Sequence, residues 1–475
     1  MLITLTAPAF AETWYIENGD ITVKASGTEG KNTVSQGNKK DVEDTNTIIT
    51  NQKTDTASSN TVTIDAGKDK VEVTLKDVNI DTSSRNNAAV SVTGSGNTTI
   101  KLNGDNALKS DIYRSGISSS GSLTISGGEN DSLTAQGGSG ANGISSSGSL
   151  TISGGTVTAT GGNSTGIVGY GGSGIYSSSG VAISGGAVTA NGGDSKDGYG
   201  GNGIYSSSVA ISGGTVKAAG GNGKDGYGGN GISSTSTTIS GGTVTANGGS
   251  GNSSGGNGIR SNGVTISGGA VNAAGGDGGN GKDGGYGIIS NDIDLSGSLE
   301  LTAKAGSPNG KALSQNDNEL DLDTIKEKLG PGAKVTATDA NGETKQVSIP
   351  RPVEPEKPVI PGESSSSSDG GSAAPSAPAS PLPGLTVTDK DGQHISYTST
   401  QSGNTLTVCV GRLTASFRIS LAALRQLRAE GIETIAFQTI LCSTTLSVDE
   451  LLAMGGEDAE AVLTHRFTDS SLTVG

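Results

Sequence analysis

The sequence predicts an all-β solenoid, followed by a Pro/Ser linker and a small α+β domain. Glycine accounts for 80 of the 475 residues, and only 31% of the residues are hydrophobic. A motif of about 28 residues recurs through the middle of the chain, as in repeat architectures. An ordinary globular domain is about 45–50% apolar. The chain is therefore too poor in apolar residues for a broad core, and it needs a fold with a narrow interior.

The repeat has two fixed landmarks. An opening Gly-Ile step places isoleucine at Ile117, Ile144, Ile175, Ile204, Ile232, Ile259 and Ile288, and an Ile-Ser-Gly-Gly core begins at Ile125, Ile152, Ile183, Ile211, Ile239 and Ile266. Each copy holds three short alternating pieces, and Gly-Gly pairs between them are typical of turns. Stacked copies would place Ile on Ile, with neighbouring coils about 4.8 Å apart. Gly/Ser-rich disorder is the alternative, and the constant phase of Ile and Val argues against it.

The flanks of the repeat predict further coils and two caps. Four alternating segments predict earlier strands, at 61–64, 71–75, 89–92 and 99–102. Trp14 to Ile16 is expected to help close the open end, as solenoids require. Strands at 299–303 and 334–337, with a short helix at 323–329, are expected at the other end. An asparagine precedes several Gly-Ile steps and is expected to form a ladder that satisfies turn backbone groups: Asn142, Asn202, Asn230 and Asn257.

The remaining segments predict processing and a second domain. Residues 1–11, MLITLTAPAFA, end in an A-x-A pattern and predict a signal-peptide remnant, with a short strand as the alternative. The solenoid is then assigned to 12–349, a Pro/Ser-rich linker to 350–385, and a small α+β domain of unknown role to 386–475. In that domain Ser420 is predicted to cap one helix and Ser447 another.

Charge and cysteine content exclude some classes of function and leave one question open. A formal net charge of -15 makes nucleic acid an unlikely partner, because phosphate binding needs clustered basic residues. No apolar run reaches about 18 residues, so no transmembrane helix is predicted. The only cysteines, Cys409 and Cys442, either form one disulfide outside the cell or stay free thiols.

Part of the N-terminal region resembles a known family. Four segments carry the resemblance: 60–67 (NTVTIDAG), 73–81 (VTLKDVNID), 89–92 (AVSV) and 102–108 (LNGDNAL). They resemble the secreted carbohydrate-binding β-helix domains of anaerobic Gram-positive bacteria, which are related in fold to pectate lyases. The resemblance covers roughly Trp14 to Ile349. It implies a right-handed parallel coil, binding of plant-type or other polysaccharide, bound calcium and a secreted or cell-surface location.

Five tyrosines recur in phase with the repeat. Tyr170, Tyr199 and Tyr227 each lie five residues before an opening Ile, and Tyr176 and Tyr205 each follow one. Stacking of the coils predicts two short aromatic ladders on the outside of the solenoid. Because sugar C–H groups pack on the electron-rich faces of aromatic rings, these residues are predicted to bind carbohydrate. The alternative is that the rings only cover Gly-rich turns and pack on one another.

Acidic loops provide a second candidate site. Residues 220–228 fit the calcium nonapeptide pattern G-G-x-G-x-D-x-U-x, and two other loops fit it partly. Asp197, Asp225 and Asp283 are the predicted metal ligands, although calcium needs six to eight oxygen atoms. A flexible glycine loop is the alternative.

Catalytic patterns are weak. The central repeats contain a single arginine, Arg260, and no recurring carboxylate pair with a base beside it. The sequence therefore predicts a monomeric, non-catalytic carbohydrate-binding protein. A structural or adhesive stalk is one alternative. A polysaccharide lyase is the other, since carboxylates from neighbouring coils of a solenoid can approach each other.

Overall fold

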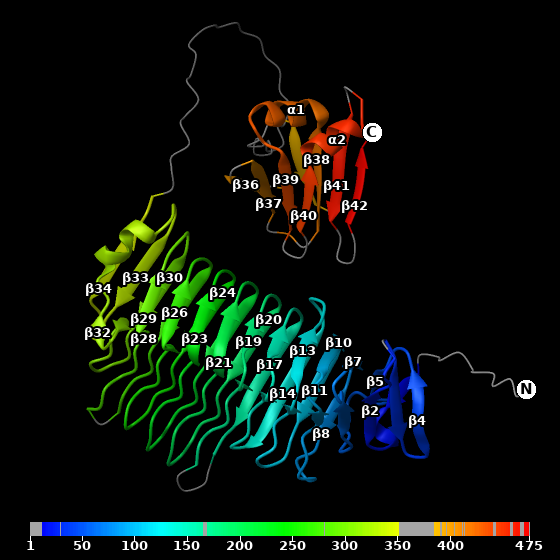
Figure 1. Cartoon of the computed structure of the whole chain (residues 1–475). Coiled ribbons are helices and arrows are strands. Elements are labelled where there is room, and N and C mark those ends of the chain that lie inside the picture. Colours follow the sequence, from blue (N-terminus) through cyan, green and yellow to red (C-terminus); the bar gives the residue numbers. More distant parts are fainter. Residues whose placement is uncertain are drawn as a thin grey trace, which may run out of the picture. The chain divides into compact units, whose positions relative to one another are not determined.

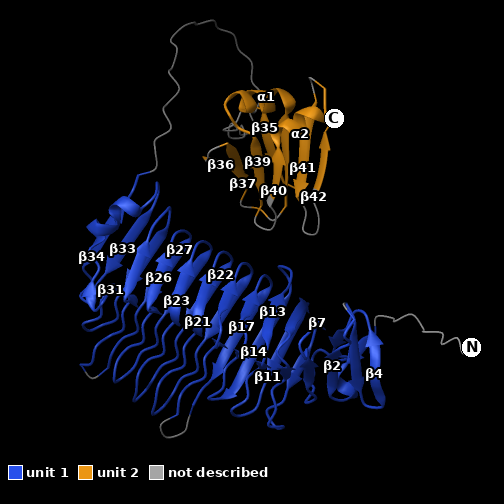
Figure 2. Cartoon of the chain, viewed as in Figure 1, with its two compact units in different colours: residues 1–356 blue, residues 357–475 orange. Residues whose placement is uncertain are grey.

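The chain divides into two compact units, Met1–Glu356 and Lys357–Gly475 (Figure 2). The computed structural model describes residues 12–28, 30–164, 169–279, 281–350, 384–389, 392–395, 397–402, 404–410, 412, 414–439, 443–456, 459–465 and 470–474. The predicted signal-peptide remnant, nearly all of the predicted linker and Cys442 lie outside these residues.

The first unit is a parallel β-helix of about 12 turns (Figure 1), which confirms the predicted solenoid. Each typical coil contributes a strand to three rows, and most strands pair in parallel with the strand one coil away. The hand of the coil remains the prediction made from the resemblance.

The three rows are formed by strands in equivalent positions. The first row is β2 (Ile21–Ala25), β6 (Val62–Asp65), β9 (Val90–Thr93), β12 (Ile117–Ser119), β15 (Ile144–Ser146), β18 (Ile175–Ser177), β21 (Ile204–Ile211), β23 (Ile232–Ile239), β25 (Ile259–Arg260), β28 (Ile288–Ser290) and β31 (Leu313–Gln315). The second row is β1 (Thr13–Tyr15), β5 (Ile48–Thr50), β7 (Lys70–Lys76), β10 (Asn97–Asn103), β13 (Ser122–Ser126), β16 (Leu150–Ile152), β19 (Val181–Ile183), the far halves of β21 and β23, β26 (Gly263–Ile266) and β29 (Asp292–Leu295). The third row is β8 (Asn79–Asp81), β11 (Asp105–Lys109), β14 (Ser132–Ser139), β17 (Thr156–Gly162), β20 (Ala187–Asn191), β22 (Thr215–Ala219), β24 (Thr243–Asn247), β27 (Ala270–Ala274), β30 (Glu300–Lys304) and β33 (Lys334–Thr338).

The register of these rows places like residues on like. Ile175 pairs with Ile204, and Ile204 with Ile232, and all three side chains are fully buried. In the third row Val216 pairs with Val244, also buried. The ladder of asparagines is confirmed for three members: the Asn202 side-chain oxygen accepts a hydrogen bond from the Asn230 backbone N–H (2.9 Å), and the Asn230 oxygen accepts one from the Asn257 backbone N–H (2.9 Å). Asn142 is separated from them by a coil with Ser173 at this position, and its side-chain oxygen accepts from the Ser173 backbone N–H (2.8 Å).

Both ends of the solenoid are covered by antiparallel strands. At the N-terminal end, β3 (Asn32–Gln36) and β4 (Lys39–Asp44) extend β2. The buried Trp14 indole donates a hydrogen bond to Asp44 Oδ2 (2.8 Å). The 3-10 helix η1 (Ile16–Asn18) follows β1. At the other end, β32 (Asn318–Glu319) and β34 (Thr344–Ser348) pair antiparallel with β31 and β33, and the predicted helix is the 3-10 helix η2 (Leu322–Lys328). These caps satisfy the requirement that a solenoid close its open ends.

The glycines do two different jobs. In the Gly213-Gly214 pair, Gly214 has a φ of +76°, so this pair forms a turn, as predicted. The pairs in the long loops instead form a glycine seam, in which backbone packs directly on backbone: Gly221 N–H donates to Gly201 O, and Gly229 N–H donates to Gly221 O (both 2.8 Å). A Cβ added at Gly221 would lie 2.1 Å from Gly193 O. Part of the interior therefore consists of hydrogen-bonded backbone, which explains how so few apolar residues suffice.

The second unit is a small α+β domain, as predicted. One antiparallel sheet holds β35 (Leu385–Thr388), β38 (Ala415–Ser420), β41 (Glu460–His465) and β42 (Ser470–Val474). The other holds β36 (Thr398–Ser402), β37 (Thr405–Cys409), β39 (Thr434–Gln438) and β40 (Ser443–Ser447). The two helices are α1 (Leu421–Ala429) and α2 (Val448–Ala453), and Ser420 and Ser447 cap them by accepting from Ala423 N and Glu450 N. The Cys409 thiol donates to Gln438 Oε1 (3.2 Å).

His465 lies fully buried in this unit and links its two sheets. Its Nε2 hydrogen-bonds Thr444 Oγ1 of β40 (2.9 Å), its ring packs edge-on against Phe417, and its Nδ1 has no hydrogen-bond partner among the described residues. Burial lowers the pKa of His465.

Acid is therefore expected to destabilise the second unit selectively. The unfolded chain binds a proton at His465 more readily than the folded one, so the free energy of unfolding falls as the pH drops through about 6.5. Each 1 kcal/mol lost lowers the melting midpoint of a domain of this size by about 4–8 °C. Calorimetry of the whole chain between neutral and mildly acidic pH checks this. The variant His465→Phe should remove the pH dependence, and a wild-type transition that is constant over that range would contradict the prediction.

Candidate functional site

The first tyrosine group forms a continuous stack on one flank of the solenoid. The Tyr170 and Tyr199 ring centroids are 5.2 Å apart with planes at 15°, and those of Tyr199 and Tyr227 are 4.8 Å apart with planes at 8°. The three side chains are 61%, 45% and 44% exposed. The predicted ladder in consecutive coils is thus confirmed. Because the rings lie face to face, both faces of the central ring, Tyr199, are turned toward its neighbours, whereas Tyr170 and Tyr227 each have a stacked tyrosine on one face only.

The second tyrosine group has a different geometry. Tyr176 and Tyr205 follow Ile175 and Ile204 on β18 and β21, so they point outward where the isoleucines point inward. Their centroids are 5.6 Å apart, but the planes are tilted by 56°. A tilted pair leaves ring face uncovered, which is the surface that a sugar ring needs.

These two tyrosines stand at one end of a polar groove over the first row of strands. A hollow of about 290 Å³ at the tyrosines adjoins a second hollow of about 300 Å³, and the two share Ser233 and Ser234. We call their lining the Tyr–Ser groove. It comprises Tyr176, Ser177, Ser178, Tyr205, Ser206, Ser207, Ser233, Ser234, Thr235, Arg260, Ser261, Asn262, Ile289, Ser290, Asn291, Asn316 and Asp317. From Tyr176 to Asn316 it crosses six coils, or about 24 Å at the usual strand spacing.

The groove is rich in groups that can bind hydroxyls. Arg260 pairs with neighbouring strands through its backbone. Its side chain makes no hydrogen bond or ion pair with the residues that the structure describes, so its five N–H donors are free. The Ser207 hydroxyl donates to Ser178 O in the preceding coil and keeps its own lone pairs as acceptors. The amides of Asn262 and Asn291 add both donors and acceptors. Pockets for apolar, drug-like molecules are lined mainly by hydrophobic side chains. This lining is mainly polar, so it suits a ligand that is covered in hydroxyl groups better than an apolar ligand.

Sequence reasoning found the tyrosines of this groove but missed its polar half. Ser233, Arg260 and Ile289 occupy the position of Tyr205 in successive later coils. Their common position could have been read from the repeat, since each directly follows an opening Ile. Asn316 and Asp317 carry no such signal, because they lie in the turn between β31 and β32, after the repeat has ended.

The predicted calcium ligands are only partly brought together. Ser195 bridges to Gly223 in the next coil, which places Asp197 and Asp225 at equivalent positions. Asp283 instead follows Tyr227 and Ser254 in another row, since Gly228 N–H donates to Ser254 O and Gly255 N–H donates to Asp283 O. Within the described ranges, no cluster of three or more His, Cys, Asp or Glu side chains could hold a metal ion.

Calcium has few remaining ligands in these loops. The carbonyl oxygens of Ser195 and Lys196 already accept hydrogen bonds from the backbone N–H groups of Lys224 and Asp225. Two carboxylates fall short of the six to eight oxygens that calcium needs. Asp197 and Asp225 would therefore supply only part of a calcium coordination shell, and calcium remains a prediction for experiment.

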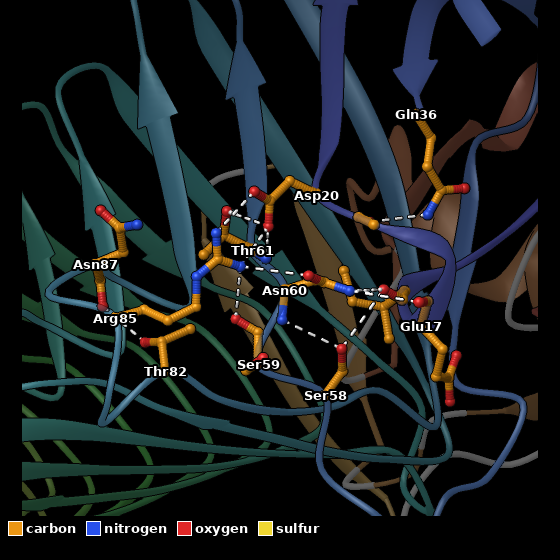
Figure 3. A network of polar contacts seen from close by, with 12 residues as sticks. Glu17, Asp20, Gln36, Ser58, Ser59, Asn60, Thr61, Thr82, Arg85 and Asn87 are labelled. Atoms are coloured by element: carbon orange, nitrogen blue, oxygen red, sulfur yellow. Dashed lines mark hydrogen bonds and ion pairs between the residues drawn. The ribbon is translucent and has the colours of Figure 1, made fainter. Parts of the chain in front are cut away.

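A third polar cluster, near the N-terminal cap, is already satisfied internally (Figure 3). Arg85 makes a bidentate contact with Asp20, at 2.8 Å and 3.0 Å, and also donates to Ser59 O. Asp20 further accepts from the backbone N–H of Thr61 (2.8 Å). Partial burial raises the pKa of Asp20, but the hydrogen bonds from Arg85 and Thr61 outweigh it and leave the pKa below its usual value. The cluster ties neighbouring coils together and leaves few groups for a ligand.

Removing the Asp20 charge is expected to lower the stability of the solenoid slightly, and the size of this loss should depend on pH. Since Asp20 is half exposed, Asp20→Asn should lower the free energy of unfolding by about 0.5–1 kcal/mol at neutral pH. A carboxylate with a lowered pKa gives its full stabilisation above its ordinary value of about 3.9 and loses it as the pH falls through the lowered pKa. The difference should therefore shrink below about pH 3.9 and vanish only below the lowered pKa of Asp20. Urea denaturation at neutral and acidic pH measures both. The control is Asp69→Asn, which changes an exposed carboxylate that has no side-chain hydrogen bond or ion pair with a described residue. An equal loss in both variants would contradict the prediction.

Comparison with protein-family models, with curated proteins and with solved structures finds no match to this chain. The resemblance carried by residues 60–108 therefore stays an expectation. No helix in the described part of the chain has the length and apolar character needed to cross a membrane.

Proposed function

We propose that this chain is an extracellular, non-catalytic polysaccharide-binding protein, and that its solenoid holds a glycan along the Tyr–Ser groove. The observation that carries the proposal is the tilted pair of Tyr176 and Tyr205 beside a run of hydroxyl, amide and guanidinium groups. Tyrosine rings offer faces for sugar C–H groups, and the polar groups offer partners for sugar hydroxyls. A groove that crosses several coils suits a linear chain better than a single sugar.

The two tyrosine groups differ in geometry, and we propose that they differ in role. In the stack of Tyr170, Tyr199 and Tyr227, both faces of Tyr199 and one face each of Tyr170 and Tyr227 are turned toward a neighbouring ring. In the tilted pair, the ring planes are 56° apart, so the two rings are not stacked face to face. We therefore assign sugar contact to Tyr176 and Tyr205 and a mainly structural role to the stack.

The proposal is tested by electrophoresis of the whole chain through gels that contain a neutral β-glucan or a polyuronate, with and without EDTA. We expect retardation by at least one polymer and no release of sugar product. Retardation that EDTA removes would assign calcium a part in binding. Absence of retardation on every polymer would favour the structural or adhesive stalk, and release of unsaturated sugar ends would favour the lyase.

A further inference from the structure

The stack of Tyr170, Tyr199 and Tyr227 has a chemical property that glycan binding does not use. Its backbone is held one coil apart, because Gly171 N–H donates to Tyr199 O and Gly200 N–H donates to Tyr227 O (both 2.9 Å). The ring centroids of neighbouring tyrosines lie 5.2 Å and 4.8 Å apart, close to the spacing of the coils that carry them. The stack ends at the next coil, where Ser254 takes the tyrosine position.

The rings are also accessible. Between 44% and 61% of each side chain is exposed. Each tyrosine stands between two glycines, as in Gly198-Tyr199-Gly200 and Gly226-Tyr227-Gly228, so its neighbours in sequence place no side chain against the ring. The backbone hydrogen bonds between coils keep neighbouring phenols at a high effective concentration, which favours a reaction between them.

We propose that this stack is a site of oxidative cross-linking, at which Tyr199 forms dityrosine with Tyr170 or Tyr227. The oxidant is a peroxidase acting with hydrogen peroxide. Each phenol loses one electron and its hydroxyl proton. The two phenoxyl radicals form one C–C bond between ring carbons adjacent to the hydroxyl-bearing carbons, and the hydrogens on those carbons return to the oxygens by tautomerisation. Hydrogen peroxide takes up the two electrons and two protons and leaves as two water molecules.

The dityrosine would link neighbouring coils covalently, on the flank where the glycine seam lies. The link joins residues one repeat apart in sequence, so it constrains the unfolded chain as a disulfide does. A secreted solenoid whose seam depends on backbone contacts alone would gain resistance to local opening there.

The experiment treats the dilute whole chain with a peroxidase and hydrogen peroxide. We expect monomeric protein with dityrosine fluorescence, a mass lower by two hydrogen atoms for each link, and proteolytic peptides in which Tyr199 is joined to Tyr170 or Tyr227. The melting midpoint of the solenoid should rise on cross-linking.

Phenylalanine variants isolate the stack without removing a ring. Tyr199→Phe should lose the links within the stack, because Tyr170 and Tyr227 are then two coils, or about 10 Å, apart. Any link between Tyr176 and Tyr205, whose centroids are 5.6 Å apart, is told apart by its peptides. Tyr170→Phe should keep the link between Tyr199 and Tyr227, and Tyr15→Phe, at the distant cap, should behave as the wild type. Undiminished dityrosine in Tyr199→Phe, or links only between separate chains, would overturn the proposal. Because the test measures covalent products, its failure leaves the glycan-binding proposal untouched.

Discussion

The double variant Tyr176→Ala/Tyr205→Ala is expected to lose polysaccharide binding, with an affinity at least about 30-fold lower than that of the wild type. Both rings line the Tyr–Ser groove and are tilted rather than stacked face to face, so both proposed sugar contacts disappear together. Stability should change little, because both side chains lie outside the Ile and Val interior. Retardation in polymer-containing gels measures the binding, and thermal melting measures the stability.

The matched control is Tyr199→Ala, which removes one exposed tyrosine from the stack and leaves the groove intact. It is expected to bind polysaccharide as the wild type does. The opposite pattern, in which Tyr199→Ala abolishes retardation and the double variant keeps it, would place the glycan on the stack and contradict the groove.

Gly221→Ala is expected to destabilise the solenoid by about 3 kcal/mol or more, at the upper end of the range for overpacked interiors. The added Cβ would lie 2.1 Å from Gly193 O, a backbone atom that cannot rotate aside. The coils would have to separate, and the hydrogen bonds from Gly221 to Gly201 and from Gly229 to Gly221 would weaken. Urea denaturation followed by circular dichroism measures the loss.

Gly263→Ala provides the comparison, since it adds the same methyl group on the same solenoid. Nothing lies within 4 Å of the position of its Cβ, and its φ is not positive. Its stability should stay within about 1 kcal/mol of the wild type, because it chiefly stiffens the unfolded chain. Equal effects of the two substitutions would show that the seam is not close-packed.

The groove depends on the register of neighbouring strands. The repeated sequence specifies this register within the repeats, but not beyond the last copy. Tyr176, Tyr205, Ser233 and Arg260 all follow an opening isoleucine, so their shared row is implicit in the sequence. Their chemistry differs from coil to coil, however, and no single copy of the repeat displays a site. Asn316 and Asp317 join the groove only because the capping turn folds beside β28.

The sequence by itself determined the solenoid, its repeat, its caps, the asparagine ladder and the separate α+β domain, because each depends on local periodicity or on a short capping pattern. Tertiary structure alone decided three things. It set the ring planes, so that one tyrosine group stacks and the other tilts. It placed Asp283 outside the row of Asp197 and Asp225, because loops of unequal length shift the register. It turned loop glycines into a packed seam, because the close approach of two backbones depends on residues a full coil apart and leaves no local signal beyond glycine itself.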